Sequence, residues 1–157
     1  MHIHAYSNCV KKVTGLIKCN CFAARQAARQ VTRFYEREMA DARLTSAQFS
    51  ILVLLHENDD MSMTGLAERM NMDRTTLLRA VKPMQRDGLV TSRRKNDGLG
   101  DPRSLALNIS SSGSRRLKQA LDLWVAAQRK FETALGPARA ARLRDDLHAV
   151  SQLELAG

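Results

Sequence analysis

Apolar residues recur at helical spacing near both ends of the chain, which predicts long amphipathic helices there. Within residues 20–42 the apolar stripe consists of Ala24, Ala27, Ala28, Val31, Phe34, Tyr35 and Met39. A longer stripe follows residues 111–135 and contains Leu117, Leu121, Trp124, Gln128, Phe131 and Leu135. The dipeptide Gly136-Pro137 then breaks the pattern. The helix after this break is expected to bury Leu143, Leu147 and Val150.

Shorter helices with clear start signals are predicted between residues 44 and 71. Thr45 and Gln48 have the spacing of a capping box, and they precede an apolar run that stops in a polar turn. Ser62 or Thr64 can cap a second, shorter helix. These signals predict two helices joined by a turn.

A third helix, which Asp73 caps and which runs to about residue 87, has two different faces. Its predicted buried stripe consists of Leu77, Leu78, Val81 and Met84. Its opposite stripe consists of Thr75, Arg79, Lys82 and Arg86. Pro83 predicts a kink or a tightened last turn, and Gly88 is placed to end the helix.

Residues 90–95 and 103–109 are predicted to form the two strands of a hairpin. Leu105, Leu107 and Ile109 alternate with Ala106 and Asn108, which is typical of a half-buried strand. The segment between the strands contains two glycines and favours a turn.

Basic charge is concentrated in the same part of the chain. The whole sequence has 25 Lys and Arg against 16 Asp and Glu, a formal net charge of +9. Residues 44–68 carry no basic and four acidic side chains, whereas residues 69–103 carry nine basic and four acidic ones. A partner with phosphate charges explains this distribution, and solvated basic faces are the alternative.

Helix, turn, helix and a basic hairpin together predict a winged helix-turn-helix that binds double-stranded DNA. The expected fold is mainly α-helical with a small β-hairpin wing. The lobe at residues 44–110 is expected to bind DNA. Residues 20–43 and 111–157 are expected to form a helical dimerisation lobe, and residues 1–19 a partly ordered leader. Two such lobes about 34 Å apart would place two helices in successive major grooves.

The candidate DNA-binding residues fall into two groups. On the third helix, the arginines can pair with guanine, the threonines can contact base edges or phosphates, and the last two basic residues are placed for phosphate; these residues are Arg74, Thr75, Thr76, Arg79, Lys82 and Arg86. In the hairpin, four basic residues can contact phosphate or the minor groove, and one aspartate can orient them; they are Arg93, Arg94, Lys95, Asp101 and Arg103.

The sequence resembles the MarR family of bacterial transcriptional regulators over about residues 20–155. The matching motifs are LTSAQF at 44–49, LAERM at 66–70, DRTTL at 73–77, DGLV at 87–90 and DPR at 101–103. The resemblance implies a homodimer, a palindromic operator, and repression relieved by a small molecule or an oxidant. It assigns base recognition to Arg74, Thr75, Thr76 and Arg79, and the wing motif to Asp101 and Arg103. Ile109-Ser110 replaces the usual Leu-Thr before the long helix.

Two features are candidates for sensing a signal. Cys21-Phe22-Ala23 resembles the cysteine segment of the peroxide-responsive branch, and a thiol near a helix start can be oxidised selectively. Cys19 could respond as well, although both thiols could equally be inert at a dimer interface. Trp124 could line a cavity for a small aromatic effector, although packing in the core is the favoured interpretation.

Several other classes of protein are disfavoured. The residues His2, His4, Cys9, Cys19 and Cys21 match no zinc spacing, so no metal or other cofactor is expected. No apolar stretch approaches 18 residues, so no membrane partner is expected.

The three cysteines form no disulfide framework and the N-terminus is a poor signal peptide, which favours a cytoplasmic protein. No catalytic constellation is present, so an enzyme is not expected. A sequence-specific dimeric repressor and a non-specific architectural nucleic-acid-binding protein remain as competing hypotheses.

Overall fold

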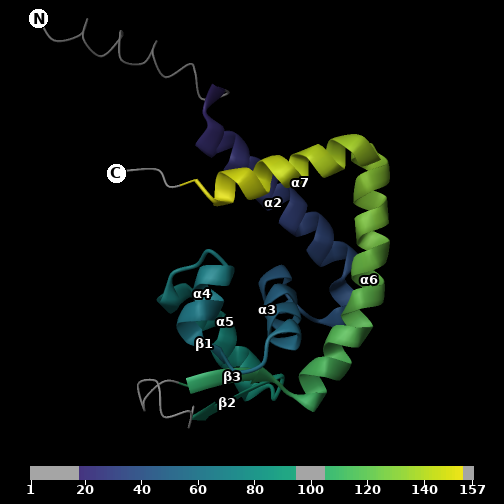
Figure 1. Cartoon of the computed structure of the whole chain (residues 1–157). Helices are drawn as coiled ribbons and strands as arrows, with labels where there is room; N and C mark the ends of the chain where they lie inside the picture. The colour runs from purple at the N-terminus through teal and green to yellow at the C-terminus, as the bar shows by residue number, and fades with distance from the viewer. Residues whose placement is uncertain (1–17, 95–104, 154–157) are drawn as a thin grey trace, which may run out of the picture.

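The computed structural model describes residues 18–94 and 105–153, which form a mainly helical chain with a small antiparallel sheet (Figure 1). The elements, in chain order, are α2 (Asn20–Glu38), the 3₁₀-helix η2 (Ala40–Ala42), α3 (Ser46–Glu57), β1 (Met61–Ser62), α4 (Met63–Arg69), α5 (Arg74–Arg86), β2 (Val90–Arg94), β3 (Leu105–Ile109), α6 (Ser111–Leu135) and α7 (Pro137–Ser151). The predicted fold class, mainly α with a β wing, is therefore confirmed.

The helices form two groups that α6 connects (Figure 1). Helices α3, α4 and α5 lie with the sheet in one group, and α2 and α7 each contact α6 in the other. Lys130 on α6 donates to Glu38 on α2 and holds the pKa of that carboxyl below its usual range. Arg144 on α7 pairs with Glu132 on α6 at 3.6 Å. These contacts fix the second group on the long helix.

Side-chain caps begin four of the helices, and those of α3, α4 and α5 lie at positions that the sequence predicts. Gln48 N donates to Thr45 Oγ1 at 3.2 Å and Thr45 N donates to Gln48 Oε1 at 3.0 Å, which is the predicted capping box. Of the two candidates for α4, Ser62 is the cap, because Gly65 N donates to its Oγ at 3.0 Å. Asp73 caps α5 and Ser110 caps α6 in the same way.

The helix ends agree less closely with the predictions. α2 stops at Glu38, and a separate 3₁₀ turn takes the chain on to Ala42, so the helix predicted over residues 20–42 is confirmed as far as Glu38 and its predicted end is wrong. At the end of α5, the helix continues past Pro83 to Arg86 and Gly88 follows with φ +70°. Only glycine adopts that angle freely, which explains the stop.

The sheet has three strands in the order β1-β3-β2, one more than the hairpin predicted from the sequence. β1 pairs with β3 through Met61 and Leu107, and β2 pairs with β3 from Val90 opposite Ile109 to Arg94 opposite Leu105. Two-residue strands carry no period, which is why the sequence pattern could not reveal β1. The predicted strand ends at residues 95 and 103–104 lie outside the described residues.

The core lies between α3, α4, α5, the sheet and the first half of α6. Its fully buried large side chains are Ile51, Leu52, Leu55, Leu66, Leu77, Val81, Met84 and Leu107. Two predicted members are exposed instead. Leu78 is 37% exposed because it points to the outer face of α5, and Leu105 is 47% exposed because it lies at the end of β3 farthest from α6.

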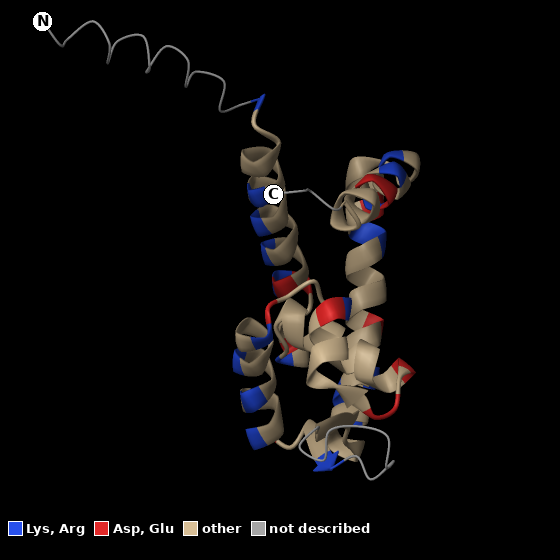
Figure 2. Ribbon diagram, turned by 60° about the vertical axis from the view of Figure 1, so that its left-hand side comes forward, with Lys and Arg blue, Asp and Glu red and all other residues tan. Residues whose placement is uncertain are grey.

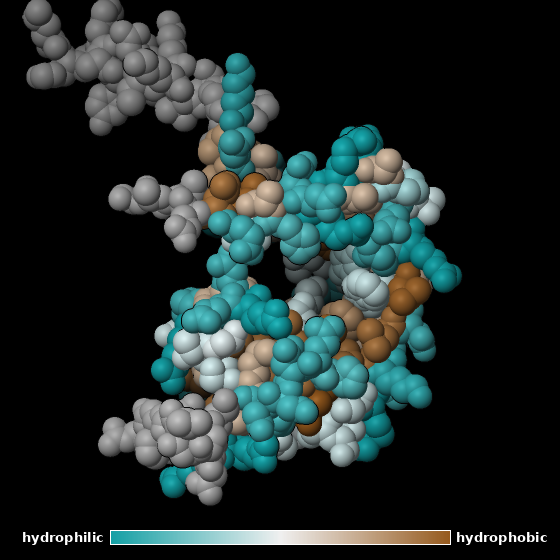
Figure 3. All heavy atoms as spheres, in the orientation of Figure 1, coloured by the Kyte–Doolittle hydropathy of each residue, from teal (hydrophilic) through white to brown (hydrophobic). Residues whose placement is uncertain are grey.

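The apolar stripes of α2 and α7 remain largely uncovered in the single chain. α2 has no buried residue, and Ala24, Ala27 and Ala28 are exposed. The expectation that Leu147 and Val150 are buried is wrong for one chain, because they are 52% and 61% exposed. Apolar side chains gather near the end of α7 and along α6 in Figure 3. None of the helices in the described ranges has the length and apolarity to cross a membrane.

Candidate nucleic-acid interface

The start of α5 is fixed by hydrogen bonds to Asp73. Thr76 N donates to Asp73 Oδ1 at 2.9 Å, and the Thr76 hydroxyl donates to Oδ2. These bonds hold the pKa of the Asp73 carboxyl below its usual range, with the bond from the Thr76 hydroxyl contributing most. The Thr76 hydroxyl proton is therefore engaged within the protein, although its oxygen can still accept a bond.

Burial of one face of α5 turns its basic residues outward. Leu77, Val81 and Met84 are buried in the core. The outward residues, all exposed, are Arg74, Thr75, Thr76, Leu78, Arg79, Lys82 and Arg86. Figure 2 shows the basic residues at successive turns of this helix. The structure therefore brings together every residue that the sequence assigned to the recognition helix.

The basic residues of α5 differ in their partners. Arg86 pairs with Asp87, with 2.9 Å between Nε and Oδ1, and that bond raises the pKa of Arg86. Within the described part of the chain, Arg74, Arg79 and Lys82 form no ion pair. Their donors are thus available for a ligand along the exposed face of α5.

The wing residues are only partly described. Arg94 lies exposed at the end of β2. Arg93, on the same strand, instead donates from Nε to Asp60 Oδ1 at 2.8 Å and also forms an ion pair with Oδ2 through Nη2. This bond raises the pKa of Arg93. The candidates Lys95, Asp101 and Arg103 lie outside the described residues.

Three residues near this surface were not singled out as functional by the sequence. Leu78 was missed because periodicity assigned it to the core, although its four-residue spacing from both Arg74 and Lys82 places it on their face. Asp60 and Asn108 were missed because their contact spans 48 positions. No local pattern in the sequence could have predicted that pairing.

A separate cleft lies between α3, α4 and α6, beside the core that α3, α4, α5 and the sheet form. Its volume of ≈ 620 Å³ lies within the range of small-molecule sites, roughly 300–1,000 Å³. Phe49 and Trp124 stack there with ring centroids 6.2 Å apart, and Arg69 and Glu57 also line it. Trp124 is 36% exposed, so it lines this cleft instead of being buried.

The two described cysteines lie at the start of α2. Cys19 occupies the N-cap position and is partly buried, whereas Cys21 is exposed. Both thiols are free. Tyr35, farther along α2, donates its hydroxyl to Gln128 Oε1 on α6. No cluster of three or more potential metal ligands occurs among the described residues, while His2, His4 and Cys9 lie outside them.

Known proteins resemble this chain both in sequence and in fold. The sequence profile of the MarR family matches residues 44–98, which contain α3, α4, α5 and β2. The DNA-bound structure of the Mycobacterium tuberculosis transcriptional regulator MosR is 32% identical and has a TM-score of 0.76. Its alignment covers 85% of this chain and 94% of that chain. The chain belongs to the MarR family.

Other MarR-type regulators agree with this assignment. The organic hydroperoxide resistance transcriptional regulator of Bacillus subtilis is 26% identical over 66% of this chain and 68% of its own length. The transcriptional repressor YetL of the same organism is 29% identical over 60% of this chain and 56% of its own length. These matched proteins are transcriptional regulators, and the chain is accordingly a MarR-family transcriptional regulator with a DNA-binding winged helix.

Proposed function

We propose that this MarR-family protein is a cytoplasmic homodimeric repressor that binds a palindromic operator through α5. The observation that carries the proposal is the outward face of α5, on which Arg74, Arg79 and Lys82 form no ion pair with any other described residue. A major groove admits one α-helix, and arginine pairs with the edge of guanine through two hydrogen bonds. Leu78 adds an apolar contact for a thymine methyl group on the same face.

Contacts to phosphate complete the proposed interface. Lys82 and Arg86 lie toward the end of α5, where side chains of a groove-bound helix meet the DNA backbone. Arg94 at the end of β2 can contact the backbone beside the same groove. The DNA-bound MosR structure, at 32% identity, supports the use of this fold for binding DNA.

The uncovered apolar surfaces support the proposed homodimer. α2 and α7 expose apolar side chains, and an apolar cleft of ≈ 360 Å³ between α2, α6 and α7 includes Val31, Phe131, Leu143 and Leu147. Large exposed apolar surfaces mark contacts with other proteins. A second copy of this chain would cover them and would supply the second recognition helix that a palindrome requires.

Two ways of releasing the protein from DNA have support. Cys21 is an exposed thiol at a helix start, and the hydroperoxide resistance regulator among the relatives supports release by oxidation of Cys19 or Cys21. The cleft beside Trp124 supports release by a small aromatic effector, which would stack on the rings there and contact Arg69.

Replacing Arg79 by alanine is expected to remove discrimination at one base pair of each half-site. The lost pair of hydrogen bonds to guanine corresponds to about 1–3 kcal/mol at that position. The loss of discrimination is measured by titrating, at a fixed salt concentration, operator variants that each carry one base-pair substitution. Arg29→Ala, on exposed α2, removes the same charge and is expected to keep the discrimination.

The competing hypothesis predicts a different result. If the wild-type protein binds operator and unrelated DNA equally at every salt concentration, it is an architectural binder and the proposal is wrong. If Arg79→Ala and Arg29→Ala lose the same affinity on every sequence, Arg79 contacts phosphate and the proposed base recognition is wrong.

Treatment with an organic hydroperoxide is expected to release the wild-type protein from DNA, and Cys21→Ser is expected to remain bound. Oxidation of the exposed Cys21 thiol adds a polar group or a disulfide at the start of α2, which disturbs the dimer. A gel shift with and without oxidant measures the release, and Cys19→Ser serves as the matched variant. Unchanged binding of the wild-type protein in oxidant would exclude oxidative release and leave the cleft as the sensor.

A further inference from the structure

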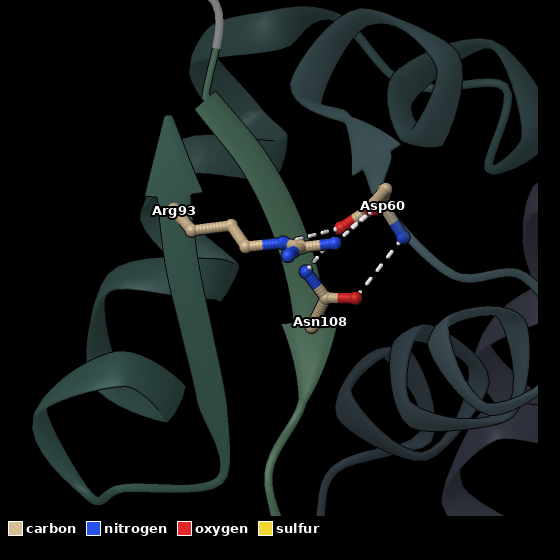
Figure 4. Close-up of polar contacts among 3 residues, drawn as sticks. All are labelled: Asp60, Arg93 and Asn108. Atoms are coloured by element: carbon tan, nitrogen blue, oxygen red, sulfur yellow. Dashed lines mark hydrogen bonds and ion pairs between the residues drawn. The ribbon is translucent and has the colours of Figure 1, made fainter. Parts of the chain in front are cut away.

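Asp60 joins both long strands of the sheet through a network of hydrogen bonds (Figure 4). Arg93 on β2 donates from Nε to Asp60 Oδ1 at 2.8 Å. Asn108 on β3 donates from Nδ2 to the same oxygen at 2.9 Å, and its Oδ1 accepts from Asp60 N at 3.0 Å. One residue of the turn before β1 thus binds one residue from each wing strand.

The backbone is arranged to permit this network. β3 lies between β1 and β2, so the Arg93 side chain must pass across β3 to reach Asp60, as Figure 4 shows. The residue opposite Arg93 in the sheet is Ala106, whose small side chain leaves room for that crossing. Asp60 has φ 54°, in the left-handed region that aspartate and asparagine tolerate better than most residues.

We propose that Asp60 is a positioning residue for DNA binding: with Asn108 it holds Arg93, and so the outer part of β2, in the orientation that places Arg94 on the DNA backbone. The inference rests on the proposed DNA-binding function. It also changes the role expected of Arg93 from a phosphate contact to a structural link. A guanidinium that makes two bonds to one carboxylate has fixed geometry and few donors left for phosphate.

The proposal predicts an effect opposite to that of simple electrostatics. Removing a negative charge near DNA normally strengthens binding, because it lowers repulsion of the phosphates. Asp60→Asn keeps the size of the side chain and tolerates the left-handed backbone, but it loses the ion pair to Arg93. We expect it to weaken operator binding about five- to tenfold, which corresponds to the loss of about one phosphate contact.

The control is the neighbouring residue Asp59, which is exposed and acts on Arg93 by charge alone. Asp59→Asn removes the same charge and is expected to bind DNA as well as the wild-type protein or more tightly. Arg93→Lys keeps the positive charge but cannot make both bonds to Asp60. It is expected to bind DNA as weakly as Asp60→Asn. The double variant should bind DNA no more weakly than either single variant.

The test is a series of DNA titrations at several salt concentrations, with thermal melting to confirm that each variant folds. A lost wing contact lowers the slope of log K against log salt by about 0.9 for Asp60→Asn and Arg93→Lys, but not for Asp59→Asn. The inference is wrong if Asp60→Asn binds as tightly as Asp59→Asn, or if Arg93→Lys binds like the wild type. If Asp60→Asn does not fold, the DNA binding of Arg93→Lys alone decides whether the inference is right. Absence of operator preference in the wild type would instead contradict the proposed function.

Discussion

Replacing Leu147 by aspartate is expected to give a monomer that binds the operator at least about a hundredfold more weakly. Leu147 lines the apolar cleft between α2, α6 and α7 and is 52% exposed in the single chain. A carboxylate buried in this mostly apolar interface would cost several kcal/mol in the dimer, whereas it is solvated in the monomer. A monomer carries one recognition helix and loses the second half-site.

Sedimentation velocity and DNA titration measure the two consequences on the same samples. The matched control is Ala149→Asp, which adds the same charge on α7 but about 200° away around the helix. Ala149 is exposed and does not line the cleft, so this variant is expected to remain a dimer. A Leu147→Asp protein that stays dimeric would show that the interface lies elsewhere.

Replacing Gly113 by alanine is expected to destabilise the protein by about 1–3 kcal/mol. A Cβ on Gly113 would lie 2.2 Å from the backbone oxygen of Leu89 and 2.9 Å from Ile109 Cγ1. The Leu89 oxygen cannot move away easily, because it accepts a hydrogen bond from Ser110 N at 3.0 Å. The start of α6 must therefore shift away from the residue that leads into β2.

Thermal or denaturant unfolding at one fixed protein concentration measures this change, because dimer formation makes apparent stability depend on concentration. The control is Gly65→Ala in α4, where the added Cβ would lie 3.3 Å from the Ser62 side chain. That variant is expected to stay within about 1 kcal/mol of the wild type, since alanine also favours the helix. Equal stability of Gly113→Ala and the wild type would contradict the close packing described here.

Local signals explain why much of the DNA-binding group could be predicted from the sequence. Thr45, Ser62, Asp73 and Ser110 each cap a helix through a residue three positions ahead, so one short motif identifies both partners. The outward face of α5 follows in the same way, because the buried Leu77, Val81 and Met84 fix the direction of its arginines.

The errors arise where contacts between distant residues decide the structure. Leu78 fits both the apolar period of α5 and the four-residue spacing of its basic face, and the packing of the core decides that it faces outward. Arg93 looks like any other basic residue of a wing until Asp60, 33 positions earlier, is placed beside it. Leu147 and Val150 continue the apolar stripe of α7, but the described residues of the single chain leave both of them exposed.

The central claim, that two α5 helices of a dimer read a palindrome, is tested most directly by a hydroxyl-radical footprint on the preferred binding site. The account predicts two protected segments related by two-fold symmetry, with their centres about one helical turn of DNA apart. Arg79→Ala should weaken both segments equally. Uniform protection along the DNA, or a single protected segment at saturating protein, would contradict the claim.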